Sequence, residues 1–157
     1  ETGVHIRYNF PAILHTPDGN EFRIHTNLDT NVSLLKIYPG INQQIVHSIL
    51  NVENLRAVVL ESFGAGNAPD TPWLLNEIDS AIRKGILFLN VTQCAEGSVE
   101  MGLYDSSIKL EKLGVISGRD MTTEAAITKL MYLLGKYSLP EDIRTDLNKS
   151  LRGEINI

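Results

Sequence analysis

The sequence lacks the features by which membrane, disulfide-bonded and nucleic-acid-binding proteins are recognised. A single cysteine among 157 residues cannot form an internal disulfide, so the fold does not depend on an oxidising compartment. The longest apolar runs have the length of a strand, which predicts no membrane-spanning helix. Lys and Arg number 14 against 19 Asp and Glu, and no window is strongly basic, which argues against binding of nucleic acid or of an anionic membrane. We therefore expect a small solute or another protein as the partner.

The composition is that of one globular domain. Apolar residues make up 43% and charged residues 21% of the chain, close to the averages for globular proteins, and the length allows one hydrophobic core. The chain begins at Glu1 without an initiator Met or a signal peptide, and an apolar alternation starts at once with Val4, Ile6 and Tyr8. We expect it to be cut from a longer protein.

Residues 4–26 predict a hairpin. Two short alternating stretches flank a turn signal in which Pro17 presets φ at one position and Gly19 accepts a positive φ at another. The fold is therefore expected to begin with a short N-terminal hairpin or extended segment.

From residue 33 onward, apolar runs of strand length alternate with segments of helical period. The runs are Val32–Tyr38, Ala57–Leu60, Ile86–Val91 and Val115-Ile116. Because they are nearly continuous rather than alternating, they predict strands that are covered on both faces. The fold class is α/β: an open parallel sheet with helices on both faces, in the three-layer arrangement of flavodoxin-like and Rossmann-like folds.

The helical segments carry recognisable start signals. Thr71 and Pro72 match an N-cap and a first-turn proline, and Ser138-x-x-Glu141 matches a capping box before the last helix. The predicted helices cover roughly residues 41–50, 71–84, 106–112, 123–137 and 140–150.

Polar side chains cluster after the predicted strands. In an open α/β sheet, ligands bind beyond the carboxyl ends of the strands, so the loops there are the candidate site. These loops carry Tyr38, Glu61, Ser62, Asn67, Thr92, Gln93 and Cys94. The glycines at 64 and 66 form only a G-x-G pattern, which is typical of a structural turn more often than of a phosphate site.

Cys94 follows a predicted strand, where nucleophiles on such sheets often lie. No histidine follows it in the sequence to act as its base, since the four histidines are at 5, 15, 25 and 47. A small buried or ligand-contacting thiol is the more common explanation of such a cysteine. No His, Cys or carboxylate cluster has metal-ligand spacing, and we expect neither a metal nor a cofactor.

Several spaced motifs stand out along the chain. They are Tyr38-Pro39-Gly40-Ile41, residues 60–69 (LESFGAGNAP), residues 90–94 (NVTQC) with Gly97 and Met101-Gly102-x-Tyr104, residues 114–125 (GVISGRDMTTEA) with Lys129-Leu130, and Leu151-Arg152-Gly153-Glu154. Together, and in this order, they resemble the C-terminal domain of cytoplasmic (type I) bacterial L-asparaginases.

The resemblance implies a function for the longer protein. Such enzymes hydrolyse L-asparagine to L-aspartate and ammonia with a threonine nucleophile and a Thr-Asp-Lys set, all in an N-terminal domain whose Thr-Gly-Gly-Thr and Gly-Thr-Asp-Thr strings are absent here. We therefore expect residues 1–33 to be an interdomain hairpin or linker and residues 34–157 the C-terminal α/β domain. Without the catalytic half this chain is expected to be inactive, and the family implies a cytoplasmic homo-oligomer, a dimer or a tetramer.

The resemblance also assigns roles to individual residues. The position of Asn67 supplies a side-chain amide to a neighbouring subunit's active site, where it can donate and accept hydrogen bonds to a bound amino acid. Some type I enzymes hold an allosteric asparagine at positions matching Glu61, Asn67, Cys94 and Thr122. Glu61 stands where the regulated enzyme has an arginine, which reverses the charge that faces the effector's carboxylate.

Alternatives remain open at the level of sequence. The chain could be a free-standing α/β module that binds a small amino acid, or the C-terminal domain of an asparaginase-like subunit of a tRNA-dependent amidotransferase. A cysteine-dependent amidohydrolase using Cys94 is the remotest hypothesis. Preference for asparagine or glutamine depends largely on residues outside this chain.

Overall fold

The computed structural model describes residue 13 and residues 23–156. The predicted hairpin at residues 4–26 therefore falls largely outside the described residues. Within them, no helix combines the length and the apolarity that a membrane crossing requires.

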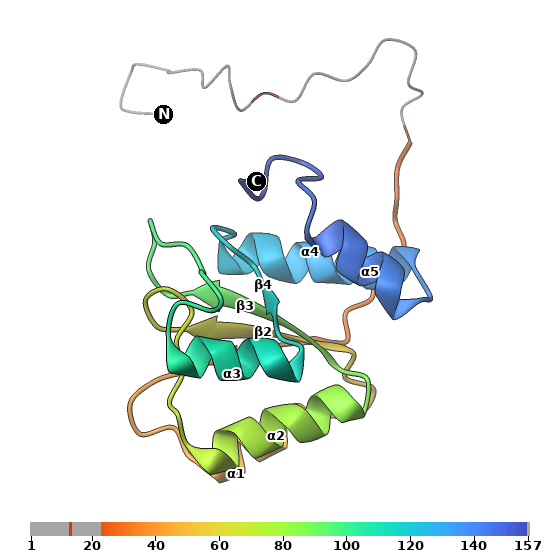
Figure 1. Cartoon of the computed structure of the whole chain (residues 1–157). Coiled ribbons are helices and arrows are strands. Elements are labelled where there is room, and N and C mark those ends of the chain that lie inside the picture. The colour runs from red at the N-terminus through yellow and green to blue at the C-terminus, as the bar shows by residue number, and fades with distance from the viewer. Residues whose placement is uncertain (1–12, 14–22, 157) are drawn as a thin grey trace, which may run out of the picture.

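Four strands and five helices alternate along the described chain (Figure 1). The strands are parallel and follow one another in the order β1-β2-β3-β4, which confirms the open parallel α/β sheet. The elements are β1 (Val32–Lys36), α1 (Gln43–Leu50), β2 (Ala57–Ser62), α2 (Pro72–Arg83), β3 (Leu87–Thr92), α3 (Asp105–Leu113), β4 (Ile116–Ser117), α4 (Thr123–Lys136) and α5 (Pro140–Leu147).

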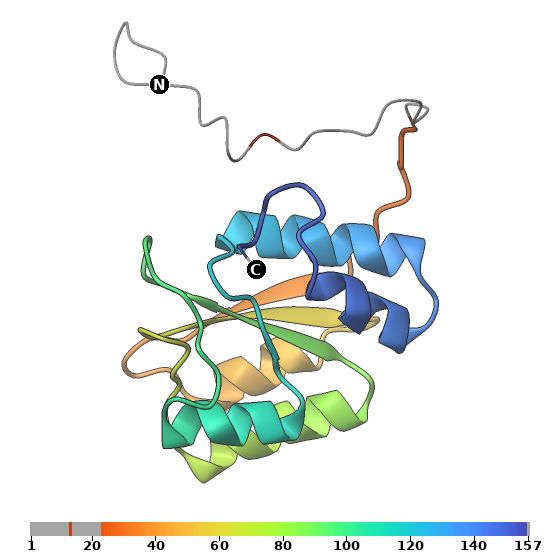
Figure 2. The same ribbon diagram turned by 45° about the horizontal axis from the view of Figure 1, so that its top comes forward.

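The helices cover both faces of the sheet, as the continuous apolar runs predict. Figures 1 and 2 show α1, α2 and α3 on one face and α4 and α5 on the other. Successive residues of β2 accordingly face opposite layers: Val58 and Leu60 pack with the first group of helices, and Ala57 and Val59 with the second. All six residues of β3 are buried, because this strand has a neighbour on each side and helices on each face.

The helix starts follow the predicted signals with one exception. Thr71 is the N-cap of α2 with Pro72 next to it, although its hydroxyl makes no capping hydrogen bond. The predicted capping box at Ser138 was wrong: the N-cap of α5 is Leu139, without a side-chain cap. The physical reason is Pro140, which has a fixed φ and no N–H and therefore fits the first helical position, moving the cap to the residue before it.

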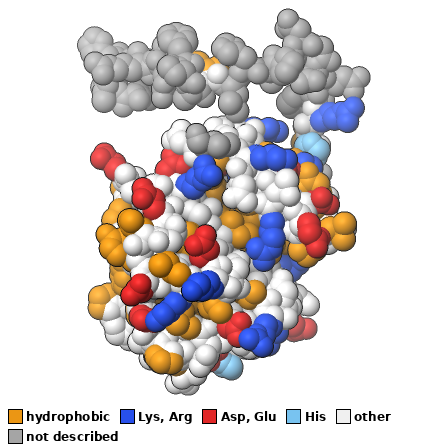
Figure 3. All heavy atoms as spheres, viewed as in Figure 1, with side chains coloured by type: hydrophobic (Ala, Val, Ile, Leu, Met, Phe, Trp, Pro, Cys, Tyr) orange, Lys and Arg blue, Asp and Glu red, His pale blue; other side chains and the backbone are white. Residues whose placement is uncertain are grey.

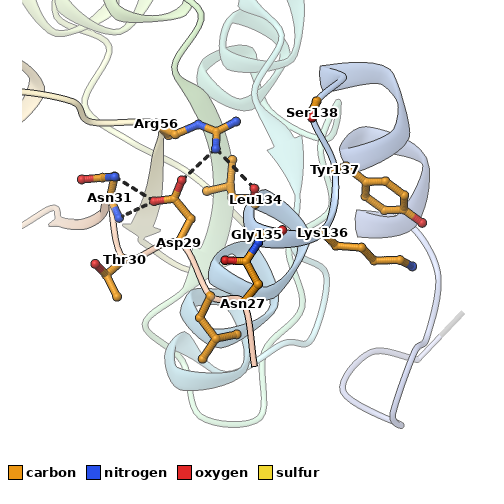
Figure 4. Close-up of a pocket in the computed structure, with 11 residues that line it drawn as sticks. Asn27, Asp29, Thr30, Asn31, Arg56, Leu134, Gly135, Lys136, Tyr137 and Ser138 are labelled. Atoms are coloured by element: carbon orange, nitrogen blue, oxygen red, sulfur yellow. Dashed lines mark hydrogen bonds and ion pairs between the residues drawn. The ribbon is translucent and has the colours of Figure 1, made fainter. Parts of the chain in front are cut away.

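The C-terminal end of α4 holds the segment that precedes β1 (Figure 4). The Arg56 guanidinium donates to Asp29 Oδ2 over 2.7 Å and to the carbonyl of Leu134 over 3.3 Å. The Asn27 amide donates to the carbonyl of Gly135. Any Cβ at Gly135 would collide with the Asn27 carbonyl, so this approach requires glycine. An open polar cavity of about 590 Å³ lies beside the contact.

A second contact fastens the C-terminal segment to α4. Lys129 is 5% exposed, and its ammonium donates to Glu154 Oε1 over 2.7 Å and to the carbonyls of Leu147 and Lys149. Glu154 also accepts from the backbone N–H groups of Leu151 and Arg152. We call the contacts of Arg56, Asp29, Gly135, Lys129 and Glu154 the α4 anchor.

Candidate functional site

The carboxyl ends of β2 and β3 are joined by buried polar side chains. Ser62 Oγ donates to Asn90 Oδ1 over 2.6 Å, and Asn90 Nδ2 donates to the carbonyl of Gly66 over 3.0 Å. Both side chains are fully buried. Because a buried polar group without a partner is costly, this pairing specifies how the loop after β2 sits on β3. Asn90 was predicted within a strand and within the motif at residues 90–94, but its part in shaping this loop was not predicted.

The last residue of β3 and the residue after it form hydrogen bonds with the neighbouring loops. Thr92 Oγ1 donates to the carbonyl of Gly64 over 2.6 Å and accepts from the backbone N–H of Cys94 over 3.0 Å. Gln93 Nε2 donates to the carbonyls of Glu61 and Ile37. The structure thus brings together the loops after β1, β2 and β3. We call this region, with Asn67 below, the carboxyl edge.

The loop after β2 forms a tight turn that presents Asn67. The backbone N–H groups of Phe63 and Asn67 each donate to the other's carbonyl over 2.8 Å. Gly66 has φ +101°, and a Cβ there would lie 2.6 Å from Val99 Cγ1. A residue with a side chain cannot replace it without displacing Val99, so the G-x-G pattern is explained by the turn itself.

The side-chain oxygen of Asn67 is held by the first turn of α3. Ser106 Oγ donates to Asn67 Oδ1 over 2.9 Å. One helical turn later, Lys109 Nζ donates to both carboxylate oxygens of Asp70, which ends the same loop. Ser106 was not among the predicted site residues, because 39 residues separate it from Asn67 and no local pattern links them.

Glu61 has a cationic partner that the sequence analysis did not consider. Lys36 lies opposite Glu61 in the β1–β2 register, and Lys36 Nζ is 3.1 Å from Glu61 Oε1. The Glu61 side chain is 12% exposed and that of Lys36 is 55% exposed. The negative charge at this position is therefore compensated from the neighbouring strand. Parallel pairing of the two predicted strands was the signal that could have suggested this pair.

Cys94 and Thr122 lie in different settings. Cys94 is exposed after β3. Thr122 is the N-cap of α4, and its hydroxyl accepts from the backbone N–H of Ala125 over 3.2 Å. Within the described part of the chain, no hydrogen bond joins Thr122 to Glu61, Asn67 or Cys94.

The loop before Thr122 is tied to the C-terminal segment. Asp120 accepts from the backbone N–H of Asn156 over 2.9 Å. Burial alone would raise the pKa of Asp120, but the backbone and side-chain hydrogen bonds from Asn156 outweigh it and lower that pKa. Asp120 therefore stays ionised and holds the C-terminal segment next to this loop.

The described histidines are engaged away from Cys94. His25 packs edge-to-face on Tyr132, with ring centroids 5.7 Å apart, and His47 Nδ1 is 3.0 Å from Glu77 Oε2. No set of three His, Cys, Asp or Glu side chains within residues 13 and 23–156 is arranged to hold a metal ion. On the face shown in Figure 3, acidic and basic side chains are interspersed.

Comparisons with known proteins find asparaginases by family, by sequence and by structure. Residues 31–146 match the glutaminase/asparaginase C-terminal domain family. L-asparaginase 1 of Escherichia coli (strain K12) is 40% identical over 156 residues, which cover 99% of this chain and 45% of that protein. The crystal structure of L-asparaginase I from Vibrio cholerae has a TM-score of 0.81 at 37% identity, covering 88% of this chain and 42% of the other.

A similar region occurs in a relative whose name describes another activity. One of the subunits of the glutamyl-tRNA(Gln) amidotransferase of Methanococcus maripaludis (strain C7) is 38% identical over 136 residues, 87% of this chain and 32% of that protein. The chain thus spans less than half the length of each of these relatives.

Proposed function

The chain belongs to the glutaminase/asparaginase C-terminal domain family, and on that premise we propose that it is the C-terminal domain of an L-asparaginase. The longer enzyme hydrolyses L-asparagine to L-aspartate and ammonia in the cytoplasm. Similarity along 99% of the chain to an L-asparaginase carries this proposal. Residues 1–33 link this domain to the catalytic half and residues 34–157 form the domain itself, with β1 straddling that boundary.

Asn67 is the residue by which this domain serves catalysis. In a homo-oligomer, a dimer or a tetramer, its amide enters the active site of a neighbouring subunit and contacts the bound amino acid. The turn at residues 63–67 supports this role, because it holds the backbone of Asn67 from both sides while Ser106 of α3 binds the side-chain oxygen.

The chain itself does not perform the chemistry. Its sequence holds neither the Thr-Gly-Gly-Thr nor the Gly-Thr-Asp-Thr string of the resembled enzymes. The threonine nucleophile and its Thr-Asp-Lys set belong to the catalytic half, and the 157-residue chain alone releases no ammonia from asparagine.

A regulatory asparagine site involves Glu61, Asn67, Cys94 and Thr122. The Lys36–Glu61 pair bears on it, because a paired glutamate repels the carboxylate of a ligand less than a free one would. Lys36 also places a cation beside the position where the regulated enzyme has an arginine.

The test uses the full-length protein that contains this chain. Ammonia release from L-asparagine is measured for the native protein, for Asn67→Ala and for Asn148→Ala, a control amide whose side chain caps its own helix. We expect asparaginase activity, a KM raised at least roughly tenfold by Asn67→Ala, and no change with Asn148→Ala.

Two outcomes would overturn the proposal. One is activity only on glutamine in the presence of tRNA, which would favour the amidotransferase relative. The other is unchanged kinetics in Asn67→Ala, which would remove this residue from the pocket.

A further inference from the structure

The Asn67 side chain is anchored at one atom only. Its oxygen accepts from Ser106 Oγ over 2.9 Å, while its backbone N–H and carbonyl are both paired with Phe63. Among the described residues, Asn67 Nδ2 has no hydrogen-bond partner, and it is not one of the buried unpaired atoms. The two N–H donors are thus unpaired within the described residues and not fully buried.

We propose that Ser106 is a positioning residue, which fixes the Asn67 amide with its oxygen on α3 and its N–H donors directed at the carboxylate of the bound amino acid. This inference rests on the proposed function, since it concerns the same amide in the neighbouring subunit's pocket. It adds Ser106 of α3 to the site, and it states which atoms of the Asn67 amide contact the ligand.

The electrostatics of α3 favour this orientation. Ser106 is the second residue of α3, where the unpaired backbone N–H groups make the helix end partially positive. An amide oxygen facing this end is stabilised, whereas an amide NH₂ facing it is not. Without the hydroxyl, the amide oxygen loses its hydrogen bond and only the weaker field of the helix end opposes a rotation by half a turn, which would exchange the donor and the acceptor.

The hydroxyl sits on a rigid part of the helix. Ser107 Oγ accepts from the backbone N–H of Tyr104 over 3.1 Å and donates to the carbonyl of Tyr104 over 2.8 Å, which closes the first turn. The Lys109–Asp70 pair holds α3 against the end of the loop independently of Ser106. Loss of the Ser106 hydroxyl therefore changes the orientation of the amide and leaves the loop in place.

The direction of the contact is tested at Asn67 itself. Asn67→Asp keeps the shape but replaces the donors by a charged acceptor, which repels a substrate carboxylate and attracts an ammonium group. We expect Asn67→Asp to raise the KM for L-asparagine in the full-length enzyme at least as much as Asn67→Ala does. A KM for Asn67→Asp below that of Asn67→Ala would show that the amide contacts the ammonium group and would overturn the assignment.

The role of Ser106 is tested by three variants of the same enzyme. Ser106→Ala should raise KM about three- to tenfold, the effect of losing one neutral hydrogen bond, with kcat within about twofold. Ser106→Thr keeps the hydroxyl and should restore the native KM. Lys109→Ala is the matched control, because it removes the other contact of α3 with this loop and should leave KM unchanged.

Each result separates this inference from the proposed function. If Asn67→Ala raises KM and Ser106→Ala does not, Ser106 has no positioning role and the proposed function stands. If neither variant changes KM, the proposed function fails as well. Equal losses in Ser106→Ala and Lys109→Ala would mean that only loop attachment matters. If Ser106→Ala does not form the native oligomer, Ser106→Cys takes its place, because the thiol has a similar volume and is a weaker hydrogen-bond donor. A raised KM in Ser106→Cys would support the positioning role, and a native KM would overturn it.

Discussion

The carboxyl edge and the α4 anchor are both rich in polar contacts, but they differ in what they leave free. In the anchor, each Lys129 proton has an acceptor and the Glu154 carboxylate receives backbone N–H groups as well as the ammonium. At the carboxyl edge, the Asn90 side chain pairs with Ser62 and with the Gly66 carbonyl, whereas the Asn67 amide N–H groups have no partner among the described residues and Cys94 is exposed. Complete internal pairing is typical of a structural contact, whereas unpaired donors at the carboxyl edge are what the proposed ligand contact of Asn67 requires.

The largest effect is expected where the anchor buries a charge. Lys129→Met leaves the Glu154 carboxylate, which is 14% exposed, without its cation. Breaking one side of such a pair costs about 3 kcal/mol of unfolding free energy. Urea unfolding measures it, with Lys112→Met on the exposed side of α3 as control. A loss of unfolding free energy under about 1 kcal/mol would mean that the α4 anchor does not differ from the carboxyl edge in its contribution to stability.

A smaller loss is expected at the other anchor contact. Gly135→Ala would favour helix formation on an open surface, but here the added Cβ meets the Asn27 carbonyl. We expect a net destabilisation of about 2 kcal/mol, the usual cost of overpacking. Thermal unfolding of Gly135→Ala shows whether the change stabilises or destabilises the domain, and Ser80→Ala, at an exposed helical position, is the control. A stabilised Gly135→Ala would mean that residues 27–31 do not hold this position.

The anchor also predicts how stability depends on acidity. Burial raises the pKa of Glu154, but Lys129 and the N–H groups of Leu151 and Arg152 outweigh it and lower that pKa from 4.5 to about 2. Because the folded-state pKa is depressed, this stabilisation is complete above pH 4.5 and is lost as the pH falls toward 2.

Glu154→Gln should therefore flatten the decline of stability across that window. Unfolding midpoints at a series of pH values measure the slope, and Glu96→Gln, at an exposed carboxylate, should leave it unchanged. An equal slope in the native protein and in Glu154→Gln would contradict the contact between α4 and the C-terminal segment.

The smallest effect on stability is expected at the carboxyl edge. Lys36 is 55% exposed, and surface ion pairs contribute little, so Lys36→Met should change the unfolding free energy by less than about 0.5 kcal/mol. In the full-length protein the same variant should weaken asparagine binding at the proposed regulatory site, because Glu61 then faces the ligand unpaired. Titration of Lys36→Met with asparagine checks this, and Lys84→Met at the end of α2 is the control variant. A large loss of stability would place Lys36 with the structural contacts.

Much of the fold could be predicted from local patterns. The runs at 57–60 and 86–91 became β2 and β3 because strands buried on both faces need continuous apolar side chains. The start of α5 was placed wrongly at Ser138, since the rigid ring of Pro140 outweighed a capping pattern based on side-chain identity. The sequence also predicted that the polar loops would meet at one edge of the sheet, and the structure brings the loops after β1, β2 and β3 together there, because parallel strands end on one side.

Pairings across the sequence were beyond local patterns. Ser106 with Asn67 and Lys36 with Glu61 join different elements, and only the strand register and the packing of α3 bring them within hydrogen-bond distance. The same holds for Lys129 and Glu154, two residues of recognised motifs whose connection was not visible in the sequence.

By itself, the sequence determined the α/β class, the helices on both faces, the loops that carry the polar side chains and the family, because hydrophobic period and motif order are local and linear properties. The tertiary structure alone decided which atoms of those loops are satisfied and which remain free. That depends on distances between segments far apart in the chain, and it is what separates the accessible amide of Asn67 from the closed contacts around Lys129.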